Sequence, residues 1–339
     1  MNIIYLLLAF LAFSILIIGH ELGHFVVAKL NNVMVEEFSV GMGPKIFGIK
    51  KKETEYCLRA IPIGGFVKML GEQGEDSKDP RAFSNKKPIQ RMSIALAGPI
   101  MNFILAIVFF AIIGCVNGVP TSVISKIENN SPAYNAGVLA GDKITEVNGE
   151  KISNWNSFIQ AINEKNGGTI NLTLNRGNTL ISKRITPLKL EKENRYIIGV
   201  SPSIKKIGLS QGVVHGISEV NMLTKETFKF LGNLFKKKVS MSGVGGPISV
   251  MRISTKAAKA GILTLVNISA YISVQLAIFN LLPIPALDGG WILISIVEMI
   301  IGKKLNEEKV AKVTYAGFVL LISLAVVVTV KDILYPLKL

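Results

Sequence analysis

Two histidines and a glutamate near the N-terminus have the types and spacing of a hydrolytic metal site. The motif HELGH occupies residues 20–24. In a helix, His20 and His24 lie about one turn apart on the same face, so both imidazoles can bind one Zn²⁺ ion with Glu21 beside them. The metal lowers the pKa of a bound water from about 15.7 toward about 7, and the carboxylate takes its proton. This pattern predicts hydrolysis of a peptide bond with Glu21 as the general base.

The histidine content of the chain favours a metal site over a pair of structural histidines. The chain has only three histidines among 339 residues, and two of them belong to this motif. Both follow a long apolar run, where ionisable groups are costly and are seldom without a role. The alternative is that His20 and His24 are core residues with satisfied hydrogen bonds.

The composition indicates a membrane protein. Hydrophobic residues make up 49% of the chain, and the mean hydropathy is +0.44. The net charge of +15 is spread through the chain and lacks a stripe with interleaved aromatic residues, which excludes a nucleic-acid partner and suits anionic lipid headgroups of a bilayer. The two cysteines, Cys57 and Cys115, exclude both a disulfide framework and a thiolate zinc site.

The elements that must position the motif are apolar runs long enough to cross a bilayer. The first run holds the motif near its end, and no Lys or Arg precedes Lys29, so we expect it to be retained as a span rather than removed as a secretory signal. Basic residues after this run place the N-terminus outside and residues 29–93 on the cytoplasmic side. The four predicted spans are residues 3–25, 94–116, 262–282 and 313–332.

Two further segments belong to the predicted membrane part. Residues 33–70 predict a β-hairpin that contains Gly64 and Gly65, and it either offers an edge to an extended peptide or is a small peripheral sheet. Residues 83–93 predict an interfacial helix. The expected N-terminal membrane part is residues 1–116, and the C-terminal part is residues 262–339.

Between the second and third spans lies a soluble α+β module. Alternating strands and an Asn148-Gly149 turn over residues 119–190 resemble a PDZ domain, which the two preceding spans place outside the cell. Such a domain captures a peptide C-terminus, or it serves only as a plug that excludes large substrates. Residues 196–260 predict a membrane-proximal amphipathic linker.

A second polar site follows the third span. Pro283 and Pro285 interrupt the helix, and irregular backbone at membrane depth is tolerated only where it lines a cavity or is buried in protein. Asp288 then lies at the same depth as HELGH, which makes it the natural third zinc ligand; a helix cap or turn is the alternative. Asn102, near the start of the second span, is either an interhelical hydrogen bonder or a site residue.

Together, HELGH in the first span and NLLPIPALDGG (residues 280–290) in a late one around a PDZ insert resemble the site-2 protease family of intramembrane zinc metalloproteases. The resemblance is to the bacterial PDZ-containing branch, like the regulator of sigma-E protease, which cleaves membrane-anchored anti-sigma factors. It implies that His20, His24 and Asp288 bind zinc and that Glu21 is the general base. It also implies substrate binding by Asn280, Pro283 and Pro285, with the asparagine holding the unwound substrate strand. Asn102, Gly64 and Gly65 complete the expected substrate-binding set.

The expected fold is a polytopic α-helical membrane protein with about four transmembrane helices, a membrane-associated β-hairpin and one inserted PDZ domain. The expected function is zinc-dependent hydrolysis within transmembrane segments of single-span proteins, such as anti-sigma factors or signal-peptide remnants. The expected location is the bacterial cytoplasmic membrane. Two alternatives are a membrane-tethered PDZ scaffold with a vestigial metal site and an ion transporter, although four spans without a paired repeat disfavour a transporter.

Overall fold

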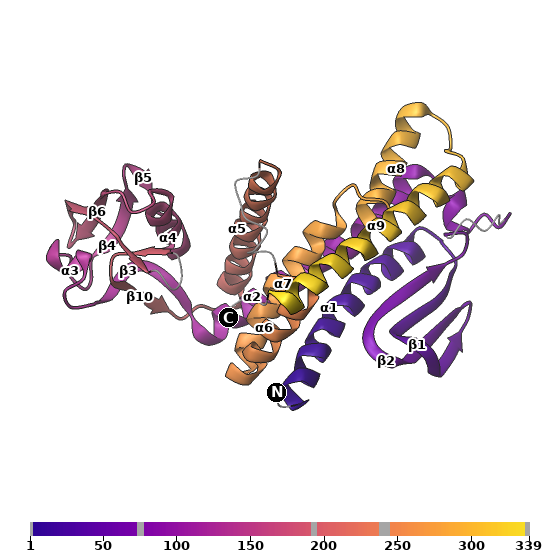
Figure 1. Ribbon diagram of the computed structural model, residues 1–339, viewed down its shortest axis with the longest axis horizontal. Coiled ribbons are helices and arrows are strands. Elements are labelled where there is room, and N and C mark those ends of the chain that lie inside the picture. The colour runs from indigo at the N-terminus through magenta and orange to yellow at the C-terminus, as the bar shows by residue number, and fades with distance from the viewer. Residues whose placement is uncertain (1–2, 73–77, 191–194, 237–244, 336–339) are drawn as a thin grey trace. The chain divides into compact units, whose positions relative to one another are not determined.

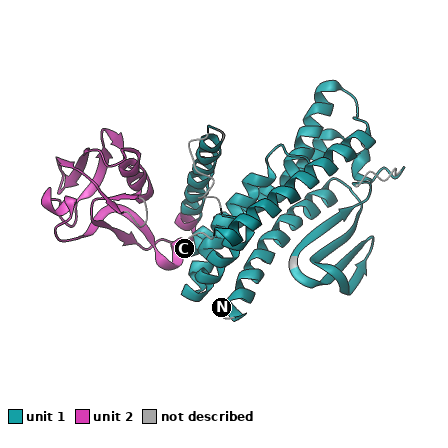
Figure 2. Ribbon diagram, in the orientation of Figure 1, with its two compact units in different colours: residues 1–113, 213–339 teal, residues 114–212 magenta. Residues whose placement is uncertain are grey.

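A computed structural model describes residues 3–72, 78–190, 195–236 and 245–335. The chain divides into two compact units (Figure 2). Unit 1 comprises residues 1–113 and 213–339, and unit 2 comprises residues 114–212. Unit 1 therefore contains both predicted membrane parts apart from residues 114–116, and unit 2 contains the inserted module.

Unit 1 is built mainly from helices (Figure 1). Its helices are α1 (Ile3–Leu30), α2 (Pro88–Asn117), α5 (Leu209–Phe235), α6 (Pro247–Ala260), α7 (Ile262–Asn280), α8 (Asp288–Ile301) and α9 (Glu307–Leu334), with a 3-10 turn at Phe83–Asn85. Four of these, α1, α2, α7 and α9, are long and apolar enough to cross a membrane. The chain thus combines four candidate membrane helices with sheet structure.

The predicted interfacial helix at residues 83–93 is not a separate element. Only Phe83–Asn85 form a short turn, and α2 then runs without a break from Pro88 through the predicted span. Proline is well tolerated in the first turn of a helix, where its missing N–H has no intrahelical partner, and no breaking residue separates the two predicted segments. Pro99 lies inside α2 without ending it.

Strands β1 (Val35–Lys51) and β2 (Thr54–Met69) form an antiparallel hairpin in the predicted place. Phe38 of β1 is matched with both Tyr56 and Val67. Two separate parts of β2 therefore pair with the same part of β1. Among the described residues, the segment 65–69 pairs with β1 only. Its second edge is therefore available, and β2 packs against α1.

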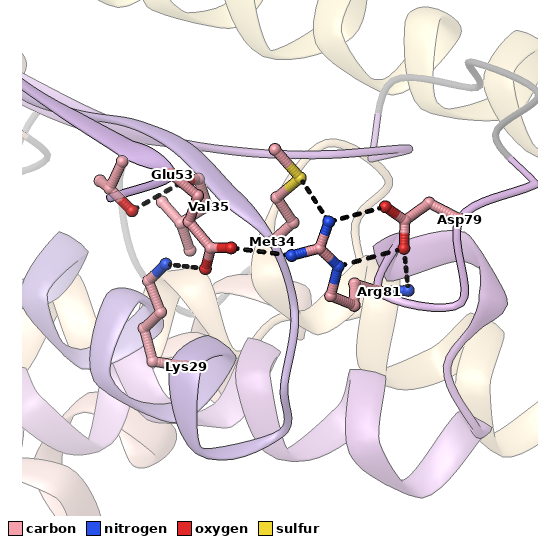
Figure 3. A network of polar contacts seen from close by, with 7 residues as sticks. Lys29, Met34, Val35, Glu53, Asp79 and Arg81 are labelled. Carbon is pink, nitrogen blue, oxygen red and sulfur yellow. Dashed lines mark hydrogen bonds and ion pairs between the residues drawn. The ribbon is translucent and has the colours of Figure 1, made fainter. Parts of the chain in front are cut away.

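Polar contacts attach the hairpin to the C-terminal end of α1 (Figure 3). Lys29 Nζ of α1 lies 2.6 Å from Glu53 Oε1 at the hairpin tip, and Arg81 Nη1 lies 2.9 Å from Glu53 Oε2. Arg81 also pairs with Asp79 at 2.9 Å and contacts Met34 Sδ. Single exposed pairs contribute little, but a network that shares Glu53 fixes the hairpin relative to α1.

Apolar packing completes unit 1 in two clusters. The first joins the end of α1 to the hairpin and to the start of α2: Ala28, Val33, Val35, Val67, Met69, Phe83 and Ile94. The second joins α2, α5 and α7: Ala106, Phe110, Val220, Leu223, Ala270, Val274 and Ile278. Helix α2 belongs to both clusters, so it holds the hairpin side and the α7 side of the unit together.

Unit 2 is an α+β module with an antiparallel sheet. The strands are β3 (Val119–Ile127), β4 (Lys143–Val147), β5 (Glu150–Lys151), β6 (Ile170–Arg176), β7 (Thr179–Ile185) and β10 (Val200–Lys205), in the order β10-β3-β4-β6-β7 with β5 beside β4; β8 (Leu188–Leu190) pairs with β9 (Arg195–Ile197), and the helices are α3 (Pro132–Asn135) and α4 (Trp155–Glu164). The core of unit 2 is apolar, with Ile124, Ile144, Leu172, Leu174 and Phe158 fully buried.

The module is longer than the predicted 119–190. Strand β10 pairs with β3 from Val200↔Ile127 to Lys205↔Val119, so the sheet needs residues well past 190. The predicted amphipathic linker at 196–260 is accordingly divided: its start belongs to the sheet, and the rest forms α5 and α6, apart from residues 237–244, which lie outside the described residues.

A buried ion pair ties α2 to α8. Arg91 Nη2 pairs with Glu298 Oε2, and the two residues are only 4% and 3% exposed. Glu298 Oε1 also accepts a 3.0 Å hydrogen bond from the Leu305 backbone N–H, just before α9. The pair therefore fixes the C-terminal half of α8 relative to α2.

Arg91→Met is expected to destabilise the protein by about 3–5 kcal/mol, because it leaves the Glu298 carboxylate buried without its counter-charge. The double variant Arg91→Met/Glu298→Leu removes both charges and is expected to recover most of this loss. Thermal unfolding of the full-length protein in detergent measures both. A double variant no more stable than Arg91→Met would contradict this account.

Candidate metal centre

The two histidines of HELGH lie where their spacing predicts. His20 and His24 occupy neighbouring turns on one face of α1 and are 8% and 9% exposed. Their Nε2 atoms are 3.2 Å apart. Both Nε2 atoms therefore point at the same small volume of space.

Asp288 enters that volume from the other end of the chain. Asp288 Oδ2 lies 3.1 Å from His20 Nε2, and Oδ1 lies 3.3 Å from His24 Nε2. One ligand atom from each of the three residues lies within 4.8 Å of the others. The Oδ2 atom is buried without a hydrogen bond of normal geometry. Two imidazole nitrogens and a carboxylate oxygen that face a common centre suit Zn²⁺, which takes three protein ligands in catalytic sites.

The loop before α8 explains how Asp288 reaches the histidines. Helix α7 ends at Asn280, and α8 begins at Asp288, with Pro283 and Pro285 between them. Ala286 has φ 77°, a left-handed conformation that non-glycine residues rarely adopt. A Cβ at Gly289 would lie 2.1 Å from Leu282 O, so only glycine allows α8 to start this close to the loop.

Glu21 lines the same cavity, whose volume is about 380 Å³. The Val67 backbone on the available edge of β2 hydrogen-bonds to its carboxylate. A Cβ at Gly65 would lie 3.9 Å from Glu21 Cγ and 2.6 Å from Ser39 O. The hairpin edge and the predicted general base are therefore direct neighbours.

The remaining predicted site residues differ in their positions. Asn280 lines the cavity, and its Nδ2 lies 3.5 Å from His20 Nε2. Asn102 also lines it, fully buried, with Nδ2 3.1 Å from His20 Nδ1. Pro283 and Pro285 lie in the loop and do not line the cavity, and Gly64 lies within β2 with a positive φ of 82°.

Two residues that the sequence pattern did not single out belong to this site. Glu72, just after β2, lines the cavity, and burial raises its pKa to about 7. Gly98 of α2 faces the imidazoles: a Cβ there would lie 2.4 Å from His24 Nε2 and 2.7 Å from His20 Cε1. The only sequence feature that points to Gly98 is the Gly98-Pro99 pair inside an apolar run. It indicates close helix packing but does not show which helix packs there.

Gly98→Ala is expected to lower zinc affinity about 10–100-fold, the range typical of disturbing groups that support metal ligands. The added methyl group overlaps His24, whose Nδ1 is held 2.8 Å from Ile94 O, so the ring cannot yield without leaving its position. Chelator competition on the purified protein measures the affinity. The matched control is Gly232→Ala, also helical, where a Cβ meets nothing within 4 Å. Equal zinc affinity in the two variants would contradict the close packing.

Comparison with known proteins identifies the family. The model of peptidase family M50 matches residues 8–324. A protein of Clostridium acetobutylicum, named as a candidate zinc metalloprotease, is 46% identical over 100% of both chains. The regulator of sigma-W protease RasP of Bacillus subtilis is 30% identical over 95% of this chain and 96% of that one. A PDZ domain of an SdrC-like protein from Listeria innocua is 28% identical, covers 26% of this chain and 97% of that chain, and has a TM-score of 0.22.

The family model and the two protein relatives match nearly the whole chain and confirm the resemblance to the site-2 proteases, the enzyme class and the zinc cofactor that the motifs predict. The chain belongs to peptidase family M50, the site-2 protease family, and is a zinc metallopeptidase.

Proposed function

We propose that the protein hydrolyses peptide bonds within the transmembrane segments of single-span membrane proteins. In this proposal His20, His24 and Asp288 bind Zn²⁺, and Glu21 is the general base. The observation that carries it is the convergence of three ligand atoms within 4.8 Å of one another, in a cavity that Glu21 also lines. Four long apolar helices among the described residues support the membrane setting.

Different residues of the site have different roles in the proposed reaction. Bound Zn²⁺ supplies Lewis acidity that polarises the scissile carbonyl and acidifies the attacking water. Glu21 takes the proton of that water and later delivers it to the leaving amine. The Glu21 carboxylate lies beside the Val67 backbone and lines the cavity. The Asn280 amide, near His20, is positioned to hold the substrate backbone.

A helical substrate hides its carbonyls in hydrogen bonds, so it must unwind before it is cleaved. In the apolar interior, each freed N–H and C=O needs a new partner. The available edge of residues 65–69 runs past Glu21 and can pair with the unwound strand. A second cavity of about 560 Å³ shares Phe66, Val67 and Trp291 with the first and extends to Tyr315 and Phe318 of α9, which offers apolar room for the rest of the segment.

The biological setting is part of the same proposal. We place the protein in the bacterial cytoplasmic membrane, with its N-terminus and unit 2 outside and its active site toward the cytoplasm. Basic residues that follow the first span support this orientation. Anti-sigma factors are the favoured substrates, since a relative is named regulator of sigma-W protease. Unit 2 is proposed to be a PDZ domain that binds a peptide C-terminus or excludes substrates with large outer domains.

Glu21→Gln is expected to lower cleavage of epitope-tagged single-span substrates at least 100-fold, because the amide cannot accept the proton of the attacking water. Zinc content is expected to stay near the wild-type level, whereas His24→Ala loses both zinc and activity. Immunoblots of substrate fragments in the same membranes, with and without chelator, measure cleavage. Wild-type cleavage by Glu21→Gln would show that the general base is wrong.

Weakening the substrate helix near the cleaved bond is expected to speed cleavage. One Leu→Gly substitution there costs the helix about 1 kcal/mol, which corresponds to roughly a fivefold faster rate if unwinding limits the reaction. The control is the same substitution near the far end of the span. Fragment appearance over time measures the rate, and equal rates for both substrates would argue against local unwinding.

A further inference from the structure

The side of His20 that faces away from Asp288 contacts a fully buried asparagine. Asn102 is 0% exposed, and its Nδ2 lies 3.1 Å from His20 Nδ1. Its Oδ1 has no hydrogen-bond partner among the described residues. A buried amide oxygen without a partner costs about 1–3 kcal/mol. An orientation that gives this oxygen a hydrogen-bond donor is therefore favoured whenever a donor is present.

The chemistry of a metal ligand determines which orientation is productive. To bind a metal through Nε2, an imidazole must carry its hydrogen on Nδ1. With the Asn102 amide nitrogen facing it, His20 Nδ1 has to accept, which puts the hydrogen on Nε2 and blocks the ligand atom. A half-turn of the amide exchanges nitrogen for oxygen. Asn102 Oδ1 then accepts from Nδ1–H, and the lone pair of Nε2 faces Asp288.

His24 also has a hydrogen-bond acceptor at its Nδ1 atom, but this acceptor is a backbone carbonyl, which has no alternative donor orientation. Its Nδ1 lies 2.8 Å from the Ile94 carbonyl oxygen, which can only accept a hydrogen bond. The hydrogen of His24 is therefore on Nδ1, and Nε2 is free to bind a metal. Both acceptors come from α2, and Gly98, midway between them in the sequence, lies against both rings, so one face of this helix packs against both imidazoles.

Asn102 is also held in place by its own backbone. The Ser273 hydroxyl of α7 donates a 2.8 Å hydrogen bond to the Asn102 carbonyl oxygen, and Ser273 is 0% exposed. Helices α1, α2 and α7 thus meet at this residue. The side chain can rotate about its own bonds while the backbone stays fixed relative to His20.

We propose that Asn102 is a positioning residue that sets the tautomer of His20 by accepting a hydrogen bond from Nδ1–H through its amide oxygen. This role differs from substrate contact, which the sequence left as one reading of the residue. The inference rests on the proposed zinc ligands but on no assumption about the substrate.

The test compares two substitutions in full-length protein that also carries Glu21→Gln, purified without metal in detergent. Asn102→Asp keeps an acceptor and removes the donor, whereas Asn102→Leu removes both at similar size. Zinc affinity from chelator competition is expected to fall about 10–100-fold in Asn102→Leu and to stay within a few-fold of the parent in Asn102→Asp. Thermal unfolding of the metal-free variants establishes whether each one is folded.

A second measurement reports the tautomer directly. The chain has only three histidines, so ¹⁵N-imidazole NMR of histidine-labelled protein resolves few signals, and a His20→Asn spectrum assigns one of them. We expect the metal-free parent, with Asn102 intact, to show His20 with its hydrogen on Nδ1, and metal-free Asn102→Leu to lose this preference. Zinc affinity unchanged in Asn102→Leu, or lost equally in a folded Asn102→Asp, would overturn the inference. If His24→Ala also leaves zinc affinity unchanged, the ligand set itself is wrong.

Discussion

The candidate metal centre depends on bringing two imidazoles and a carboxylate together inside an apolar helical unit. Burying such groups is costly unless each polar atom has a partner. Here Asp288 faces His20 and His24 at 3.1 and 3.3 Å, and the far side of each ring contacts α2. A divalent cation at their centre supplies the remaining partner, which explains why this donor set fits the zinc chemistry of the family.

The position of α8 decides whether Asp288 completes the site. At its start, Gly289 and Gly290 let the helix lie against the backbone of the loop that Pro283 and Pro285 interrupt. Toward its end, Glu298 is held by Arg91. Both supports are rigid for physical reasons: the first has no space for a side chain, and the second is a desolvated ion pair that cannot exchange its partner for water.

The same arrangement brings a strand edge to Glu21, the proposed general base. The Val67 backbone contacts Glu21, and the segment 65–69 pairs with β1 on one side only among the described residues. The Lys29, Glu53 and Arg81 contacts and the apolar cluster around Val35 hold this edge against α1. In the proposed function, an extended peptide in this place would satisfy its own backbone groups while a carbonyl approaches the metal, so peptide binding and hydrolysis would use one surface.

Local features of this protein were determined by the sequence alone. The spacing of His20 and His24 follows from the helical repeat, and the lengths of the apolar runs indicated the four long helices. Asp288 was also predicted to lie near the histidines, because it follows the third span at the same membrane depth. The β-hairpin was expected from residues 33–70, although its matching of Phe38 with two partners was not.

Only the tertiary structure decided which residues face one another. Helix α2 is apolar on nearly all sides, so its sequence carries no periodic signal for the face that meets α1. Neither the packing of Gly98 against the imidazoles nor the contact of Asn102 with His20 could therefore be assigned in advance. The joining of α2 and α8 through Arg91 and Glu298, and the extension of the module to β10, are contacts between residues far apart in the chain. Such contacts depend on how whole elements pack, which the spacing of residues along one element does not encode.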